Sequence, residues 1–370
     1  MKKTACTVLL LTGIASPAFG QSTTALAEAL NALPQFMLEN PAIVQASFVD
    51  MTVLGQLLAD PDAPPGEVLM RTGAGQGLYP LDAFQYGPEE WEQKSQIPIG
   101  DVRFFAGLGE GPNMIAVWGL ENEDSAQGLV SDLAAHREFV PVAGGEILGN
   151  GEPNATDLAG RNVYDPWTGN AGQASFVLAQ ASHVLQATTP QGVTTLMGEG
   201  PGLADSAIVA TALAGIDAAV GGGQIVQAML VSPALGLQPA DFNQLLGTEG
   251  DLDDMIAELQ TGQSGIPPYF GGLMVDAQLD APAAIFSLTF GDCDTANTAL
   301  KQIETRWADT LGEHAPGPVS GQVVEGSDGL CAAAFTVVDE TEKPFNAAFS
   351  AAFRAMMQRQ LDVFQIGVDG

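Results

Sequence analysis

The sequence predicts an α+β protein of two similar lobes that arose by internal duplication, with mostly antiparallel sheets packed with helices. Three observations support this fold class: strand-like runs follow one another directly, helices stand between pairs of strands, and one order of elements occurs twice. Strands joined without a helical crossover pair antiparallel, whereas a parallel sheet needs a helix between successive strands. We therefore expect a signal peptide at residues 1–20 and two α+β lobes, at residues 21–200 and 201–370.

Residues 1–20 have the pattern of a secretory signal peptide. Lys2 and Lys3 precede a short apolar run at residues 7–14, and small residues stand at the −3 and −1 positions of a cleavage site after Gly20. The alternative is a membrane anchor, but the apolar run is too short to span a bilayer core of about 30 Å. We expect cleavage near Gly20 and a mature protein in the periplasm or outside the cell, without a membrane span.

Both halves open with the same two elements. An Ala-rich stretch predicts a helix at residues 24–39 and again at residues 205–219. A strand follows that contains the same four residues, Ile-Val-Gln-Ala, at residues 43–46 and 225–228. Since Ala and Val are common in this chain, the shared residues alone prove little, and the order of the following elements carries the inference.

Two strand-like runs and a capped helix continue this order in each half. Asp124 and Asp294 open the two helices, because aspartate is a favoured N-cap. The order of matching elements predicts an internal duplication, and the alternative is two unrelated halves of the same α+β class. The strand-like runs are residues 102–108, 114–120, 272–279 and 284–290.

The remaining elements are a hairpin, a late strand and a final helix. Residues 176–185 and 192–197 predict a β-hairpin, and residues 331–338 predict a strand. Phe and Met residues recur at helical spacing from Phe345 to Phe364, which predicts one amphipathic helix with its apolar stripe in the core. The alternative for this stripe is a ligand groove, since Met and aromatic side chains also form adaptable binding surfaces.

This succession resembles a broad family of exported bacterial α+β proteins of unknown function with duplicated halves. The resemblance is carried by the small-residue helix that leads into the Ile-Val-Gln-Ala strand, the paired strands before an Asp-capped helix, and the final amphipathic helix. It implies the two-lobed organisation and the exported location, and it implies no catalytic residues.

The charge of the chain argues against two classes of partner. The chain has 12 Lys and Arg residues against 44 Asp and Glu residues, a formal net charge of −32. Loss of Lys2 and Lys3 with the signal peptide leaves −34. Phosphate recognition needs a basic surface, so we expect no nucleic-acid partner, and docking on anionic lipid heads is disfavoured for the same reason.

Cysteine use agrees with export. Cys6 lies within the signal peptide, so the mature chain keeps only Cys293 and Cys331. Two cysteines in an oxidising compartment most simply form one disulfide. The alternative is a metal pair, which needs further Cys or His ligands at close spacing, and the nearby His314 has no second partner.

The sequence contains no recognisable catalytic motif. His136, His183 and His314 lie far apart, and no nucleophile elbow or phosphate-binding loop occurs. A buried, hydrogen-bonded His183 is favoured over a catalytic base. We therefore expect no cofactor.

The weak candidates for metal ligands are four acidic residues, Asp251, Asp253, Asp254 and Glu258. Carboxylate oxygens suit Ca²⁺, but the EF-hand pattern fails here because no Gly follows at the required place. The alternative, which we favour, is the solvated start of a helix, where acids also stabilise the helix dipole.

One segment has the composition of a recognition site. Arg161, Tyr164, Asp165 and Trp167 lie close together in sequence, and such aromatic residues and arginines are enriched in binding surfaces. The alternative is a structured turn in which the aromatic rings fill an edge of the core and Arg161 pairs with an acid.

These observations favour a non-catalytic exported binding or scaffold protein, whose partner is a protein or a small molecule. The alternative is a periplasmic hydrolase that uses carboxylates or a metal site built from distant residues. Polar groups that converge in a cleft with perturbed pKa values would distinguish an enzyme from a binding protein.

Overall fold

The computed structural model describes residues 21–367, apart from residues 41, 76, 111–112, 143, 170–171, 199, 238–264, 316, 342 and 361. The described residues form one 12-stranded sheet with helices on both faces, and all pairs of named strands in it are antiparallel. The predicted α+β class with antiparallel pairing is therefore confirmed. Among these residues, no helix is long and apolar enough to cross a membrane.

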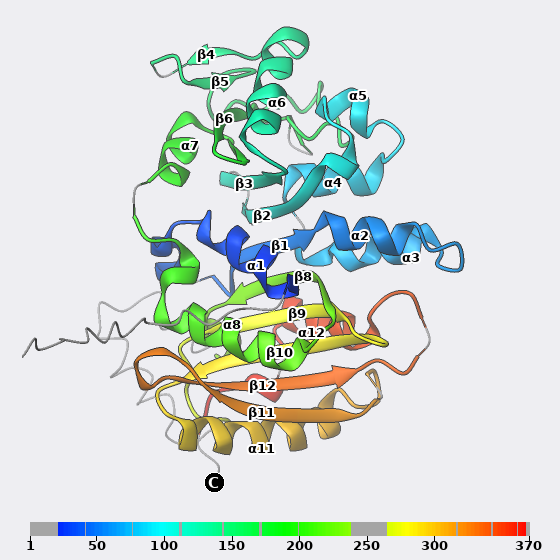
Figure 1. Ribbon diagram of the computed structural model, residues 1–370, viewed down its shortest axis with the longest axis vertical. Coiled ribbons are helices and arrows are strands. Elements are labelled where there is room, and N and C mark those ends of the chain that lie inside the picture. Colours follow the sequence, from blue (N-terminus) through cyan, green and yellow to red (C-terminus); the bar gives the residue numbers. More distant parts are fainter. Residues whose placement is uncertain are drawn as a thin grey trace, which may run out of the picture.

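The sheet runs through the whole molecule, with the first half above and the second half below in Figure 1. The first half supplies β1 (Val44–Asp50), β2 (Val102–Glu110), β3 (Asn113–Leu120), β4 (Val140–Val142), β5 (Ile147–Gly149), β6 (Phe176–Gln180) and β7 (His183–Ala187). The second half supplies β8 (Gln224–Val231), β9 (Gly272–Gln278), β10 (Pro282–Phe290), β11 (Val319–Glu325) and β12 (Cys331–Val338).

The two halves meet at the centre of the sheet, where β1 pairs with β8 and Phe48 lies opposite Ala228. The halves therefore share one sheet, whereas the sequence predicted mostly antiparallel sheets in two lobes. Outward from this pair, the strand order is β1-β2-β3-β7-β6-β5-β4 on one side and β8-β9-β10-β12-β11 on the other, so β5 and β4 extend the first side by two strands. A helix follows β3 and another follows β10, so the matching order includes helices as well as strands.

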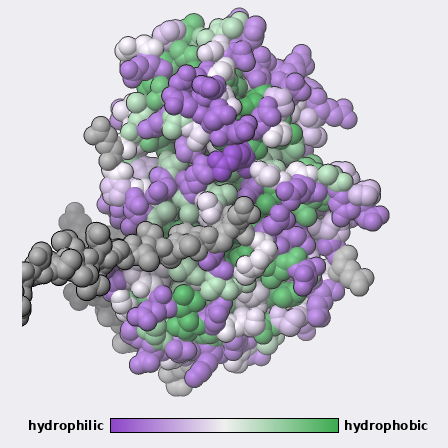
Figure 2. Space-filling model, in the orientation of Figure 1, coloured by the Kyte–Doolittle hydropathy of each residue, from purple (hydrophilic) through white to green (hydrophobic). Residues whose placement is uncertain are grey.

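Helices cover both faces of the sheet. One face carries α1 (Gln21–Asn31), α7 (Pro190–Leu196) and α8 (Ala207–Val220), and α8 lies in front of β9 and β10 in Figure 1. The other face carries α2 (Met51–Leu58), α3 (Pro65–Leu69), α4 (Tyr79–Tyr86), α5 (Trp91–Ser95), α6 (Glu123–His136), α11 (Cys293–Thr310) and α12 (Ala347–Met357). Figure 2 shows that hydrophilic residues cover much of the face in front, with smaller apolar areas between them.

The core is divided by the sheet because side chains alternate between the two faces of a strand. On the side of α1 and α8, one continuous core joins both halves and includes Leu26 and Val275. The opposite face holds two cores, one around Trp118 in the first half and one around Phe286 in the second. The boundary between these two cores, on the face away from α8, positions the site described below.

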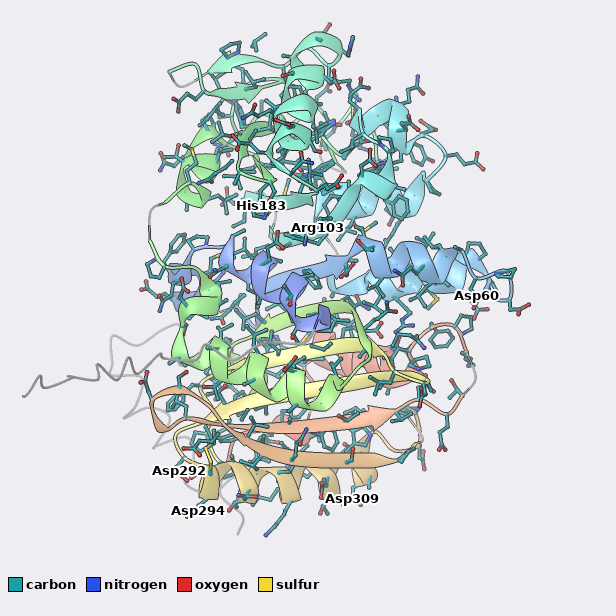
Figure 3. All side chains as sticks on the ribbon, viewed as in Figure 1. Asp60, Arg103, His183, Asp292, Asp294 and Asp309 are labelled. Carbon is teal, nitrogen blue, oxygen red and sulfur yellow. A yellow bond between two sulfur atoms is a disulfide. The ribbon has the colours of Figure 1, made fainter. Side chains whose placement is uncertain are left out.

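The two predicted helix starts are wrong by two residues. Asn122 caps α6, with its Oδ1 atom 2.9 Å from the Ser125 backbone nitrogen. Asp292 caps α11 in the same way, with its Oδ1 atom 2.7 Å from the Thr295 nitrogen, and Asp292 and Asp294 both lie at this end of α11 in Figure 3. Asn and Asp cap about equally well, so composition near a helix start does not fix which residue is the cap.

The predicted hairpin of residues 176–185 and 192–197 is also wrong in its second strand. β6 and β7 form the hairpin within the first run, with Gln180 opposite His183. Residues 190–196 form α7 instead, because the Thr189 hydroxyl caps its start and Pro190 fits the first helical turn.

The final helix is shorter than the predicted stripe. α12 ends at Met357, and Arg359 has a positive φ of 53° that breaks the helical path before a short 3₁₀ turn, η7 (Asp362–Phe364). Part of the stripe is core, as predicted, since Phe349 and Phe364 are buried. Met357 instead remains 62% exposed, so the stripe also reaches the surface.

Candidate functional site

A buried ion pair joins the two halves at the centre of the sheet. Arg71 lies at a kink within the 3₁₀ turn η2 (Met70–Gly75) of the first half, and Asp276 lies on β9 of the second. The Arg71 Nε atom is 3.0 Å from Asp276 Oδ2, and its Nη2 atom is 2.5 Å from Oδ1. The two side chains are 2% and 0% exposed, so this bidentate pair is shielded from water.

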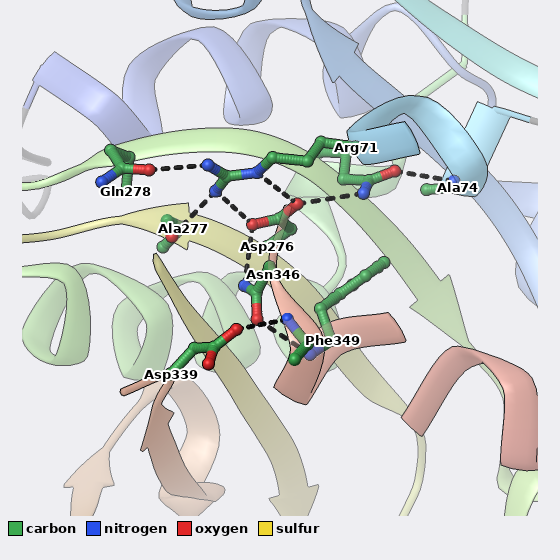
Figure 4. Close-up of polar contacts among 10 residues, drawn as sticks. Arg71, Ala74, Asp276, Ala277, Gln278, Asp339, Asn346 and Phe349 are labelled. Carbon is green, nitrogen blue, oxygen red and sulfur yellow. Dashed lines mark hydrogen bonds and ion pairs between the residues drawn. The ribbon is translucent and has the colours of Figure 1, made fainter. Parts of the chain in front are cut away.

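Every oxygen of the Asp276 carboxylate has a second donor (Figure 4). Gln227 on β8 donates its amide to Oδ2 at 3.1 Å, and Asn346 donates its amide to Oδ1 at 2.8 Å. The Arg71 guanidinium also donates to the Gln278 side chain at 2.6 Å. A buried charge pair whose hydrogen bonds are all made is a structural clamp, because no lone pair is left for a proton-transfer role.

The clamp also fixes the backbone of the elements around it. The Oε1 atom of the Gln227 side chain accepts a hydrogen bond from the Ala74 backbone nitrogen at 2.7 Å, which holds η2 on the sheet. Asn346 caps α12 by accepting from the Phe349 nitrogen at 3.0 Å. The same two amides therefore bind Asp276 and position η2 and α12, which face each other.

A cleft lies between these two elements, at the boundary of the two cores. It is a cavity of about 600 Å³ between α3, η2 and α4 on one side and α12 on the other. Its apolar lining consists of Leu69, Met70, Tyr86, Phe349, Phe353 and Met357. Its polar lining consists of Gln85, Gln227, Ser350 and Arg354. Ligand sites of small molecules have this size and this mostly apolar character.

Several large apolar side chains that line this cleft are exposed to solvent. Met70 is 59% exposed, Tyr86 is 60% exposed and Met357 is 62% exposed. Each comes from a different element, η2, α4 or α12, so together they surround one opening. Large exposed apolar side chains that gather at one cleft mark an interaction site, whereas single ones are ordinary.

A second cavity, of about 640 Å³, has the opposite chemistry. It lies between residues 57–68 and the loops that follow β9 and β12. Its charged lining is Asp60, Asp62, Asp280, Asp339, Glu340 and Lys343. Within the described parts of the chain, no group of three or more His, Cys, Asp or Glu side chains could hold a metal ion.

The structure separates the predicted segment of Arg161, Tyr164, Asp165 and Trp167. Trp167 is fully buried and stacks on Trp118 with the ring centroids 4.5 Å apart. Asp165 is buried, forms an ion pair with Arg137, and accepts a hydrogen bond from the Trp167 nitrogen at 2.9 Å. These two residues therefore match the alternative interpretation, in which the segment is a structured turn whose aromatic ring fills the core.

The other two residues of that segment face solvent. Tyr164 is 39% exposed, and Arg161 is exposed as well. Neither lines one of the cavities described above. The candidate metal ligands Asp251, Asp253, Asp254 and Glu258 lie outside the described residues.

The predicted disulfide is confirmed. The Cα atoms of Cys293 and Cys331 are 5.0 Å apart and the two sulfur atoms are bonded. The bond connects the first residue of α11 to the first residue of β12.

His183 lies beside an ion pair on the other face of the sheet. Its Nε2 atom is 3.5 Å from Glu28 Oε1, and Glu28 on α1 also binds the Arg103 guanidinium with two contacts of 2.8 and 2.7 Å. His183 and Arg103 lie near each other in Figure 3. Burial lowers the pKa of His183, so the ring is mostly neutral at pH 7 and the Arg103–Glu28 pair is the main electrostatic contact.

The carboxyl group of Asp50 makes the stability of the protein depend on pH. Its carboxylate caps α2, accepting from the Thr52 and Val53 nitrogens at 2.9 and 3.0 Å. Burial nevertheless raises its pKa from 3.8 to about 6. Since the folded state favours the protonated acid, this contribution to stability is present below the unfolded pKa and is lost as the pH rises through about 6.

We expect Asp50→Asn to be more stable than the wild type at pH 7.5, with the difference shrinking as the pH falls to 4.5. Asparagine keeps the capping oxygen and removes the buried charge. Urea unfolding of both proteins at several pH values measures this difference in free energy. A difference that stays constant with pH would show that Asp50 does not titrate in this range.

The residues of the cleft and its clamp were not predicted as a site. Gln227 and Asp276 carried a signal, since each is the one polar residue between the two end residues of its strand. Phe353 and Met357 belong to the stripe for which a ligand groove was the alternative to core. The structure brings these residues to one place. Comparison with protein-family models, with curated proteins and with solved structures finds no match for this chain.

Proposed function

We propose that this protein is an exported, non-catalytic binding protein whose ligand occupies the cleft between η2 and α12. The observation that carries the proposal is the cavity of about 600 Å³ with three exposed apolar side chains, Met70, Tyr86 and Met357, around its opening. Met side chains adapt to ligands of different shape, and Tyr offers a rigid apolar face with a polar end.

The lining of the cleft favours binding over catalysis. The described residues of the lining include no Asp, Glu, His, Cys or Lys, which leaves Tyr86 as the one side chain among them of a type that acts as a general acid or base. Ser350 and Tyr86 carry the hydroxyl groups of the described lining, and no histidine stands beside them there to activate either one. Asp276, beneath the cleft, has both carboxylate oxygens occupied by the clamp.

Two further observations support the exported location. The N-terminal residues have the pattern of a cleaved signal peptide that ends near Gly20. The Cys293–Cys331 bond is of a kind that persists in oxidising compartments and is rare in the reducing cytosol. We therefore place the mature protein in the periplasm or outside the cell.

We also propose that the two halves, residues 21–200 and 201–370, arose by duplication. The matching strand order on either side of the β1–β8 pair supports this origin. So do the helices that precede β1 and β8 and those that follow β3 and β10. In this proposal, the cleft formed where helices of one copy came to lie beside the last helix of the other.

The binding proposal is tested with Gly73→Leu and the neutral fluorescent dye N-phenyl-1-naphthylamine. Gly73 lines the cleft, and a Cβ atom added there would lie 3.7 Å from Phe353 Cε1, an ordinary contact. The leucine therefore fills the cleft without a backbone clash. We expect the wild type to bind the dye saturably and the variant to bind it at least about tenfold more weakly, a difference of about 1.4 kcal/mol.

The matched control is Gly55→Leu. Gly55 lies on α2, outside the cleft, and a Cβ atom there would meet no other atom within 4 Å. This variant should bind the dye like the wild type, and the melting temperatures of both variants should show that they are folded. Equal binding by the wild type and a folded Gly73→Leu protein would place the dye elsewhere and contradict the proposal.

A further inference from the structure

The cleft is electrostatically distinct from the rest of this chain. Acids outnumber bases 44 to 12 in the sequence, yet none of the described residues that line the cleft is Asp or Glu. The one charged residue of its lining is Arg354. The second cavity differs in charge, since acidic residues that include Asp60 and Asp280 line it.

Arg354 differs from Arg71, Arg103 and Arg137 in having no polar partner among the described residues. It is exposed in the last turn of α12, and its guanidinium makes no hydrogen bond or ion pair with the described residues. Arg71, Arg103 and Arg137 each form an ion pair with a carboxylate. In a chain with so many acids, an arginine that faces an acid-free apolar cleft is available to a ligand.

Resting on the proposed function, we propose that the ligand of the cleft is an anionic amphiphile, a long-chain carboxylate, whose head binds Arg354. The planar guanidinium matches a carboxylate with two parallel hydrogen bonds. The hydrocarbon chain contacts Phe353, Met357 and Met70, which removes apolar surface from water on both partners.

Charge decides between this ligand and its neutral or cationic counterparts. A cationic amphiphile would find no carboxylate in the lining and would meet Arg354, a like charge. A neutral amphiphile would gain the apolar contacts but make no use of the guanidinium. An anion would be repelled by most of this acidic surface, so the acid-free cleft is where it can bind.

The test compares three ligands that share a dodecyl chain: dodecanoate, dodecanol and dodecyltrimethylammonium. Each is titrated against the neutral dye bound to the wild type, dodecanol below its solubility limit and the two charged ligands below their micelle concentrations. We expect dodecanoate to displace the dye at a concentration at least about tenfold lower than dodecanol, with dodecyltrimethylammonium the weakest.

Arg354→Gln should lower the affinity for dodecanoate to about that for dodecanol. The matched control is Lys301→Gln, which removes one positive charge from an exposed site on α11 outside the cleft and should keep the wild-type preference. Equal affinities for dodecanoate and dodecanol in the wild type, or a preference that survives Arg354→Gln, would overturn the carboxylate inference while the cleft stands. Failure of the wild type to bind the dye at all would instead remove the proposed function.

Discussion

Replacing Asp276 with alanine should lower the free energy of unfolding by about 3–5 kcal/mol, because the change leaves the Arg71 guanidinium buried without its counter-charge. The arginine is 2% exposed, so water cannot take the place of the carboxylate. The change also removes the acceptor of the Gln227 and Asn346 amides. The loss is large because several buried donors lose their partner together.

Chemical unfolding in urea measures this loss, and two further variants make the result specific. Asp280→Ala removes an exposed acid just beyond β9 and should change stability by no more than about 0.5 kcal/mol. The double variant Arg71→Met, Asp276→Leu replaces the pair with apolar side chains and should recover much of the loss, since no unpaired charge remains. A loss below about 1 kcal/mol for Asp276→Ala would show that the pair is not shielded as the structure has it.

Most strands could be predicted from the sequence because each is a short apolar run between polar turns, but β4, β5 and β11 were not predicted. The predicted strand at residues 331–338 coincides with β12, and the pairs around β2–β3 and β9–β10 were placed within a few residues. Helix starts were less accurate, since Asn122 and Asp292 compete as caps with nearby acids. The strand predicted at residues 192–197 was wrong because an apolar run of that length suits either a strand or a helix. Pro190 at the start of the run favours the helix.

The site could not be predicted because its residues meet only in the folded sheet. Arg71 and Asp276 are 205 positions apart, and nothing in the local sequence of either indicates the other. The segment around Trp167 illustrates the converse problem. Its composition suits a recognition site, but Trp167 stacks within the core and Asp165 is paired with Arg137, which the sequence places 28 positions away.

Removing the Cys293–Cys331 disulfide should lower the free energy of unfolding by about 3–4 kcal/mol. The two cysteines are 38 positions apart, and the bond limits the conformations of the unfolded chain between them. In the folded protein it fastens α11 to β12, whose first residue lies opposite Phe290 of β10. The double variant Cys293→Ala, Cys331→Ala should therefore unfold at lower urea concentration than the oxidised wild type.

Reductant provides the control, because it breaks the same bond without a mutation. Dithiothreitol should bring the wild type to the stability of the double variant and leave the double variant unchanged. A wild type that does not respond to reductant under unfolding conditions would contradict the prediction. Non-reducing peptide mapping of protein from its native host should recover the linked pair, and the same digest should show a mature N-terminus near Gln21.

The expected loss of stability without the disulfide bears on the oxidising compartment that we propose for this protein. Natural domains are stable by about 5–15 kcal/mol, so about 3–4 kcal/mol is a substantial part of the total. A chain kept in a reducing cytosol would lack the contribution of the disulfide. The repulsion among its acidic residues, 44 against 12 basic ones, would remain. The stability of the protein is therefore expected to depend on reaching an oxidising compartment, where the bond between α11 and β12 can form.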